Sequence, residues 1–510
     1  MNPLSILPPD VAKQVTSHYP TIAALLVLYV VAFLALSLAA HRRYTGEADD
    51  YVVGSRSLGV IVTTFTLYAS IFSGVGIAGF PGTVYVTGMG FITTVIVGFS
   101  MSAVLQWYFG RRIWALGKIH DFQTPGDLLG GYYQSETVRL WSVIASVVFN
   151  ITFIVAQLTA GGILINVLSG GAVSFDAGVV IVAGIVFLHI VFTGIRGIAW
   201  LDTFNGVLIL IALTLFGAFI FHDAGGIGHM MSMLGDAAPA RTTIPGPVGV
   251  WSSQNIYGTA FGLLIGIAVF SPNTFLRFYA TDKKENLAKV GIGMLTLLAV
   301  SHLVGTVWIG LYGRAVLPNV SNPDWVSSLL AFKVLPIPVA AFFLISVLAA
   351  IVSTTDSYVH TMSATVTRDF IEALFWEDMT SKQEVRVNYA IVVLSAVVGV
   401  IITVFNSTVI TALATFAGGI TLQLLPATFG SVSWPRATTE AAIVSTIVGI
   451  ALTFVWELAI VPNPLSPMGF RGLFVAFVVN VVLFVAISYV TEPQSDEHIA
   501  AFHGALEEEL

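Results

Sequence analysis

The chain has 510 residues, of which 56% are hydrophobic and only 10% are charged, and its mean hydropathy is +0.89. A soluble domain carries about 25% charged residues, so this composition excludes a disordered chain and argues against a soluble multidomain enzyme. Cysteine is absent, the net charge of −7 comes with no basic tract for nucleic acid, and the class that remains is a polytopic membrane protein in contact with lipid.

Thirteen apolar segments are each long enough to cross a bilayer. They lack the alternation of an outer-membrane barrel, and a single span in lipid must satisfy its own backbone, so helices are expected. The predicted fold class is therefore an all-α polytopic membrane protein of about 13 transmembrane helices. Numbered as spans 0 to 12, the segments cover approximately residues 21–40, 59–85, 91–109, 138–168, 175–193, 198–221, 255–275, 288–311, 336–370, 388–405, 409–429, 438–461 and 469–490.

Lysine and arginine predict how these spans are oriented. With the N-terminus outside, thirteen spans place sixteen of the 21 basic residues, Arg277 among them, on the cytoplasmic side. Cytoplasmic loops of membrane proteins are enriched in these residues. The asymmetry predicts a multi-pass protein of the cell membrane with its N-terminus outside and its C-terminus in the cytoplasm.

Spans 1–10 form a candidate pair of five-helix halves, flanked by additional helices. The acidity of the last twenty residues, which include Asp496 and Glu497, predicts a solvated tail. The expected units are an N-terminal extracellular end with an extra helix (1–45), a first half (46–225), a second half (226–435), two additional helices (436–490) and an acidic cytoplasmic tail (491–510).

The first span of each half contains residues that interrupt helices. Span 1 carries Ser73-Gly74, and span 6 carries Phe270-Ser271-Pro272-Asn273. One such break alone is most often a kink or a packing device. Breaks at corresponding positions of two halves are typical of transporter binding sites, because unwound backbone at membrane depth needs a cavity beside it.

Span 8 contains an unusually polar stretch, Ser353-Thr354-Thr355-Asp356-Ser357. Helical spacing places Ala350, Ser353, Asp356 and Ser357 on one face. Hydroxyls, carbonyls and carboxylates are hard oxygen donors that suit an alkali cation. Hydrogen bonds between helices would explain the hydroxyls alone, but Asp356 and a second acid within a span, Asp202, are costly in lipid and favour an ion site.

These features resemble the sodium:solute symporter family, and the likeness covers about residues 20–490. It implies a leucine-transporter-type fold with two inverted five-helix repeats, spans 1–5 and 6–10, and broken helices 1 and 6. The chain is similar to the pantothenate and proline branch, and Ile71, Leu264 and Ala268 stand where proline transporters carry an acid or large aromatics, which favours pantothenate. The stretches that carry the likeness are 54–58 with 69–73 and 79–82, then 197–202, 272–280, and 353–357 with 367–369.

The family resemblance also implies two sets of sodium ligands. Some members of the family lack the second sodium site, and in this chain Asp356, one of its candidate ligands, could have a structural role instead. The main site would use the backbone carbonyls of Ala69, Phe72 and Ala350 and the hydroxyls of Ser353 and Thr354. The second site would use Asp202, Ser353, Asp356 and Ser357.

The solute is expected near the bilayer midplane, between spans 1, 3, 6, 8 and 10. Because no lysine or arginine is expected at mid-depth, a carboxylate would need the amides of a broken helix, and neutral solutes and small carboxylates both stay open. For each candidate, packing or interhelical bonding is the competing interpretation. The candidates are Ser70, Ser73, Asn150, Phe153, Gln157, Tyr257, Phe261, Asn273 and Gln423.

The function predicted from these features is sodium-coupled import of a small organic solute by alternating access. The solute would be a small carboxylate such as pantothenate or a monocarboxylate, or an amino acid. Na+ is the expected coupling ion, no covalent cofactor is expected, and no nucleophile–base pair or P-loop indicates an enzyme. The alternatives are a proton-coupled symporter using Asp202 or Asp356, a solute-sensing membrane module, which the short tail after Val490 disfavours, and a channel.

Overall fold

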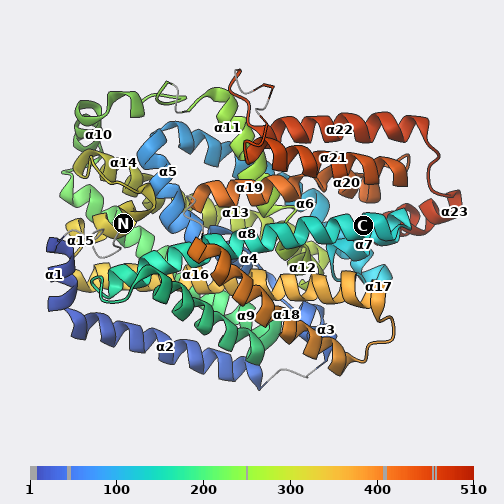
Figure 1. Cartoon of the computed structure of the whole chain (residues 1–510), viewed down its shortest axis with the longest axis horizontal. Coiled ribbons are helices and arrows are strands. Elements are labelled where there is room, and N and C mark those ends of the chain that lie inside the picture. The colour runs from blue at the N-terminus through green and yellow to red at the C-terminus, as the bar shows by residue number, and fades with distance from the viewer. Residues whose placement is uncertain (1–8, 43–46, 249–250, 406–409, 462–463, 466–467) are drawn as a thin grey trace.

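A computed structural model of the chain describes residues 9–42, 47–248, 251–405, 410–461, 464–465 and 468–510. The regular secondary structure in these ranges is helical, with one isolated bridge between Leu58 and Thr281. The long helices run roughly along the long axis of the molecule (Figure 1). They are α2 (Tyr19–His41), α6 (Gly90–His120), α8 (Glu136–Leu168), α9 (Phe175–Asp223), α13 (Lys284–Ser301) continued by α14 (Val307–Val316), α16 (Ile337–Thr365), α18 (Ser381–Phe405), α19 (Ile410–Leu422) followed by α20 (Leu425–Ser433), α21 (Thr439–Glu457) and α22 (Gly472–Val490).

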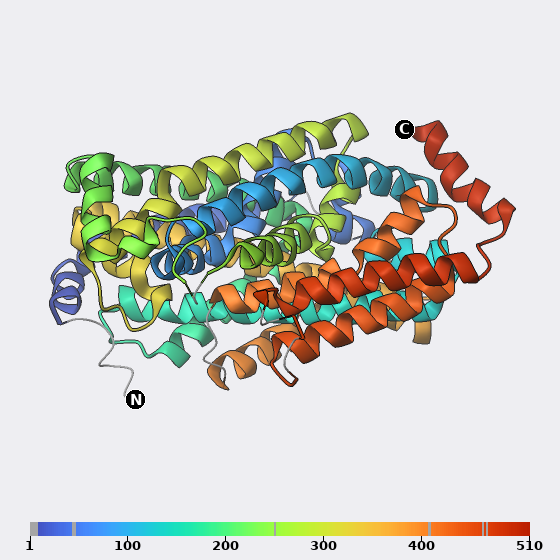
Figure 2. The same ribbon diagram turned by 90° about the horizontal axis from the view of Figure 1, so that it is seen from above.

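Short helices gather at the two ends of this bundle (Figure 1). One end holds α1 (Pro9–Ser17), α10 (Ile227–Ala237) and α15 (Val326–Val334), and the other holds α3 (Ala48–Val53), α7 (Pro125–Tyr133), α17 (Ala373–Phe375) and α23 (Asp496–Ile499). Figure 2 shows α21 and α22 along one side of the bundle, with the C-terminal helices crossing its end. There α24 (Ala505–Glu509) reaches α6, and Glu509 lies 3.1 Å from Lys118.

Eleven helical segments within the described ranges are long and apolar enough to cross a membrane, compared with thirteen predicted spans. Predicted spans 4 and 6 account for the difference. Span 4 is the first limb of α9, in which the apolar stretch described without a gap is Phe175–Phe187. Span 6 is divided into shorter helices, so neither piece has the length of a full span.

The 49-residue helix α9 reverses direction at Gly194. This residue has φ of 55°, which favours glycine, and an added Cβ would lie 3.1 Å from the Tyr51 ring. Just before α9, the Ser169 carbonyl accepts a hydrogen bond from Tyr19, and at its far end Asp223 accepts one from Tyr312 of α14. Both ends of α9 therefore lie at the end of the bundle that holds α1, and the limbs correspond to spans 4 and 5 (Figure 1).

Both predicted interruptions are present. In span 1, α4 (Val60–Gly74) is interrupted at Ser73, which has φ of 56° and ψ of −177°, and a π-helical turn (Val75–Gly79) leads into α5 (Phe80–Thr87). In span 6, α11 (Ser253–Thr259) and a π-helical turn (Ala260–Gly266) end before α12 (Pro272–Ala280) begins. The hydroxyl of Ser271 accepts from the Thr274 amide and caps α12, and proline at the first helical position lacks an amide that would otherwise be unpaired.

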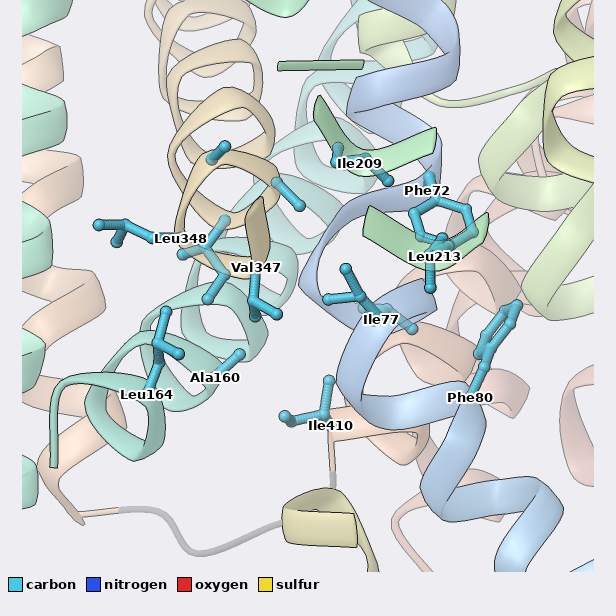
Figure 3. Close-up of a cluster of buried hydrophobic side chains, with 14 of the residues drawn as sticks. Phe72, Ile77, Phe80, Ala160, Leu164, Ile209, Leu213, Val347, Leu348 and Ile410 are labelled. Atoms are coloured by element: carbon cyan, nitrogen blue, oxygen red, sulfur yellow. The ribbon is translucent and has the colours of Figure 1, made fainter. Parts of the chain in front are cut away.

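The buried core surrounds the break in span 1. Phe72, Ile77 and Phe80 of that span project toward neighbouring helices, with Leu213 of α9 and Val347 of α16 nearby (Figure 3). Helix α16 is buried almost without interruption from Ala340 to Thr365, whereas α2 exposes Val27, Leu28, Leu34 and Leu38. An interior polar helix and an exposed apolar helix are the pattern expected when the surrounding solvent is lipid.

Candidate ion and solute site

Helices α4 and α16 meet at the residues predicted to bind sodium. The Thr354 hydroxyl lies 3.2 Å from the Ala69 carbonyl and 3.4 Å from that of Ser70. Ala69 lies one turn before the break at Ser73, and Phe72 and Ala350 belong to the same buried core. The site thus places oxygen donors from an interrupted helix opposite a hydroxyl of α16, a donor set that suits a hard cation.

Asp202, in the second limb of α9, joins the same region. Its Oδ1 accepts from the Ser353 hydroxyl at 2.6 Å, and its Oδ2 accepts from Ser357 at 3.4 Å and from Thr66. All four side chains are buried. Three of the four residues predicted for a second sodium site therefore lie together, and Thr66 of α4 is an additional hydroxyl that the sequence analysis missed.

Arg277 corrects one sequence-based expectation, because it is not a cytoplasmic loop residue. The side chain is fully buried in α12, and its Nη2 lies 3.7 Å from Asp202 Oδ2 and 2.7 Å from the Ser357 hydroxyl. The break before Pro272 starts α12 inside the bundle, so Arg277 is still within the protein interior. The signal that could have revealed it is Asp202 itself, since a buried carboxylate needs a compensating charge.

Asp356, the fourth residue predicted for the second site, faces another partner. Its Oδ2 lies 2.5 Å from Nδ1 of His189 in the first limb of α9, and both side chains are fully buried. The carboxylate is therefore engaged by an imidazole, as expected of the structural alternative for Asp356. The structure separates the polar face of α16 into an Asp202 group and an Asp356–His189 pair.

Several predicted solute residues lie around the break in span 1. The side-chain oxygen of Gln157 accepts from the Gly74 amide at 2.8 Å, and the Ser73 hydroxyl accepts from the Val75 amide at 3.0 Å. Ser70 lies 2.9 Å from Ser357, hydroxyl to hydroxyl. The amides freed by the break are therefore already bonded, and a solute anion would have to displace these partners.

The other candidates on spans 3 and 6 are buried, and they differ in whether their polar atoms have hydrogen-bond partners. The Phe153 ring lies 4.7 Å from that of Tyr358. Asn273 accepts from the Thr361 hydroxyl at 3.4 Å. Both polar atoms of the Asn150 amide are buried without a hydrogen-bond partner, which marks it as a group that a water or solute could satisfy.

The structure places three candidates away from the break. Tyr257 is 53% exposed, Phe261 packs against Phe474 of α22, and Gln423 bonds to the Gly419 carbonyl and to Asn480 of α22. For Tyr257 and Phe261, periodicity could not predict the face, because the π-helical turn in span 6 shifts the register of the residues around it.

A cavity of about 10 Å³, which is room for one water molecule, lies beside the break. Its lining is apolar except for one imidazole, so a search for polar residues could not have found it. The lining residues are Ile71, Phe72, Val75, Phe80, Phe99, Phe153, Leu263, Leu264, Ile267 and His302.

Two interrupted helices beside a polar interior helix are typical of a secondary transporter. Solved structures of such transporters share the fold. A Na+-coupled sialic acid symporter in a substrate-bound outward-open state aligns with a TM-score of 0.76 and 17% identity, over 93% of this chain and 98% of that one. Mhp1, a nucleobase-cation-symport-1 family transporter, aligns with a TM-score of 0.52 and 15% identity, over 89% and 98%. The fold is thus the predicted inverted repeat with broken helices 1 and 6.

Sequence comparison then identifies the family. The sodium:solute symporter family matches residues 51–449, and the chain belongs to it. The high-affinity proline transporter PutP of Bacillus subtilis is 27% identical over 480 residues, covering 91% of this chain and 98% of that protein. The sodium/pantothenate symporter of Escherichia coli is 27% identical, covering 83% and 88%. The predicted branch is confirmed, and the chain is a multi-pass membrane transport protein.

Proposed function

We propose that the protein imports a small organic solute into the cell by alternating access, driven by the inward sodium gradient. The observation that carries this proposal is the contact between the Thr354 hydroxyl and the Ala69 carbonyl at the end of an interrupted helix. A cation there would tie α4 to α16 through ligands from both. Because coupling between two sites is reciprocal, sodium must tighten solute binding by the same factor as solute tightens sodium binding.

The main sodium site would use the carbonyls of Ala69, Phe72 and Ala350 with the hydroxyls of Ser353 and Thr354. A hydroxyl can turn its hydrogen away and present a lone pair to the ion, so the two hydrogen bonds of Ser353 and Thr354 would be exchanged for ion contacts. Sodium binding at the main site would thereby break the hydrogen bond from Ser353 to Asp202, and the group around Asp202 would lose one of its partners.

A second sodium ion would enter the group formed by Asp202, Ser353 and Ser357. Arg277 already places a positive charge beside Asp202, so an ion there would share the carboxylate with the guanidinium. Asp356 would contribute only after leaving His189. These observations favour the main site as the coupling site.

The solute would be a small carboxylate such as pantothenate or a monocarboxylate, or an amino acid. Relatives named as proline and pantothenate transporters support this range. The binding residues proposed here are those around the break, namely Ser70, Ser73, Asn150, Phe153, Gln157 and Asn273.

Uptake by proteoliposomes tests the proposal. Vesicles containing the protein would be offered radiolabelled proline and radiolabelled pantothenate under an inward sodium gradient, an inward proton gradient, or neither. We expect accumulation of one of these solutes above the no-gradient level only with sodium. Uptake that is independent of sodium would contradict the proposal.

A proton-coupled symporter is the second candidate, favoured by the buried Asp356–His189 pair. Two titratable groups in contact inside a membrane protein are typical of proton relays. If this candidate is right, the proton gradient alone drives uptake in the same vesicles, and Asp356→Asn abolishes it. Under the sodium proposal, Asp356→Asn leaves the ion requirement unchanged.

A further inference from the structure

The guanidinium of Arg277 lies among oxygens that a second sodium ion would need. Its Nη2 donates to the Ser357 hydroxyl at 2.7 Å and to the Thr66 hydroxyl at 3.4 Å. The same nitrogen lies 3.7 Å from Asp202 Oδ2, and all four side chains are fully buried. Nε and Nη1 of Arg277 have no hydrogen-bond partner in the described part of the chain, so the guanidinium directs its hydrogen bonds at this one group.

The hydroxyls of this group are already turned toward the guanidinium. Ser357 and Thr66 each donate to Asp202 and accept from Arg277. A hydroxyl has one hydrogen and two lone pairs, and a sodium ion would need a lone pair that now faces Nη2. Arg277 and a second sodium ion would therefore compete for the same oxygens.

The charges of the group lead to the same conclusion. One carboxylate, that of Asp202, already balances the guanidinium of Arg277, which stays protonated in proteins. A sodium ion at the same carboxylate would place a second, uncompensated positive charge in a buried site, and like charges at short range are costly there. Asp356 is not free to offset that charge, because its Oδ2 lies 2.5 Å from Nδ1 of His189.

The fold holds Arg277 in this position. The residue lies in the second turn of α12, whose start inside the bundle is fixed by the Ser271 cap and by Pro272. Helix α12 packs against α4 and α16, which carry Thr66 and Ser357. The guanidinium is therefore a cation that belongs to the chain and cannot be transported with the solute.

We infer that Arg277 takes the place of a second sodium ion, so that the protein moves one sodium ion with each solute molecule. The inference rests on the proposed function, because it counts the ions of the sodium-coupled cycle. The main site keeps its ion, since the polar contacts of the Arg277 side chain are with Thr66, Asp202 and Ser357 and not with main-site ligands. Without Arg277, the carboxylate of Asp202 would attract a sodium ion, and the second site would fill.

Counting the sodium ions bound to the purified full-length protein tests the inference. Binding of radiolabelled sodium would be titrated for the wild type, Arg277→Met, Arg277→Lys and Arg277→Met combined with Asp202→Asn, with choline chloride holding the ionic strength constant. Thermal stability would be followed over the same sodium series. Lys118→Met is the control for loss of a cation, because Lys118 pairs with Glu509 at the end of the bundle, outside this group.

We expect one sodium ion per wild-type protein and two per Arg277→Met protein, in which the unpaired carboxylate of Asp202 takes an ion. Arg277→Lys retains a cation, and Arg277→Met with Asp202→Asn removes the carboxylate, so both should bind one ion, as should Lys118→Met. Each bound ion stabilises the folded state by mass action. The rise of stability with the logarithm of sodium concentration should therefore be about twice as steep in Arg277→Met as in the wild type.

Two bound sodium ions in the wild type would overturn the inference and leave sodium coupling intact. One bound ion in folded Arg277→Met, with the wild-type slope of stability, would also overturn it, because the freed carboxylate would then not attract sodium. If Arg277→Met does not fold, the wild-type count alone decides between one ion and two. Wild-type protein that binds no sodium would instead contradict the proposed function, so the two failures are distinguishable.

Discussion

Ser353 and Thr354 are neighbours in α16, yet their hydroxyls serve different partners. Ser353 bonds to Asp202 at 2.6 Å, and Thr354 bonds to the Ala69 carbonyl at 3.2 Å. The adjacent Thr355 bonds at 2.6 Å to Ile351 of its own helix. This difference separates a proposed ion ligand from a structural hydroxyl within one helical turn.

Replacing both proposed ligands, Ser353→Ala with Thr354→Ala, should raise the sodium concentration for half-maximal uptake by at least tenfold. The ion would lose two of its oxygen donors, and a hydrogen-bond-type contact to a charge contributes about 1.5–3 kcal/mol. Thr355→Ala is the matched control and should keep the wild-type sodium dependence. An unchanged sodium dependence in the double variant would place the ion elsewhere.

The buried pair of Arg277 and Asp202 should contribute strongly to stability when one partner is removed. Arg277→Met leaves the carboxylate uncompensated and should cost about 3–5 kcal/mol. Adding Asp202→Asn should recover most of that loss, because the buried charge disappears. A double-mutant cycle on thermal stability measures the coupling, and additive effects of the two substitutions would show that the pair does not interact.

The sequence could identify the polar residues of the candidate site, but it could not show which of them contact each other. Ser353, Thr354 and Asp202 stood out because polar groups in apolar spans are rare. Arg277 was predicted to lie in a cytoplasmic loop because the sequence pattern did not show that the break in span 6 starts α12 inside the bundle.

Among the elements, the crossing of span 6 with α19 is unusually close. A Cβ added to Gly266 would lie 2.0 Å from the Gly418 carbonyl oxygen, and one added to Gly418 would lie 2.1 Å from that of Gly262. Small residues let helix backbones approach in membranes. Here they bring the π-helical part of span 6 against α19, which corresponds to span 10 of the same half.

Gly266→Ala should therefore destabilise the protein by about 1–3 kcal/mol, because backbone would have to move to admit the methyl group. Gly184→Ala is the matched control, since an added Cβ at that position of α9 meets no atom within 4 Å. Melting temperatures of the detergent-purified variants give the comparison. Equal stability of the two variants would show that the crossing is looser than described.

The element pattern was largely predictable because long apolar segments dominate the sequence. Eleven of the thirteen predicted spans correspond to helical segments, within the described residues, that are long and apolar enough to cross a membrane, and both interruptions were marked by serine, glycine or proline. The reversal at Gly194 in α9 was predicted only as a boundary between spans 4 and 5. The π-helical turns were not predictable, because they depend on packing rather than on residue type.

At the scale of the whole molecule, ion pairs gather at the end that holds α3, α7 and α17. Arg139 and Arg368 both bond to Asp127 of α7, at 3.3 and 2.9 Å, and Arg196 pairs with Asp50 of α3. The enrichment of arginine there agrees with a cytoplasmic face. The orientation itself, with the N-terminus outside, stays a prediction.

The cysteine-free sequence makes that orientation directly testable. Single cysteines would replace two exposed acids, Asp236 in α10 and Asp378 between α17 and α18. In intact cells, a membrane-impermeant maleimide should label Asp236→Cys, and it should label Asp378→Cys only after the membrane is permeabilised. The opposite pattern would invert the topology, and labelling of both in intact cells would contradict the span assignment.

The most direct test of the central claim is the movement of sodium with the solute. Proteoliposomes would receive radiolabelled sodium outside, with and without the solute that shows sodium-dependent uptake. The account predicts that the solute accelerates sodium entry and that Ser353→Ala with Thr354→Ala removes the acceleration. Sodium entry that does not respond to the solute would contradict coupled transport.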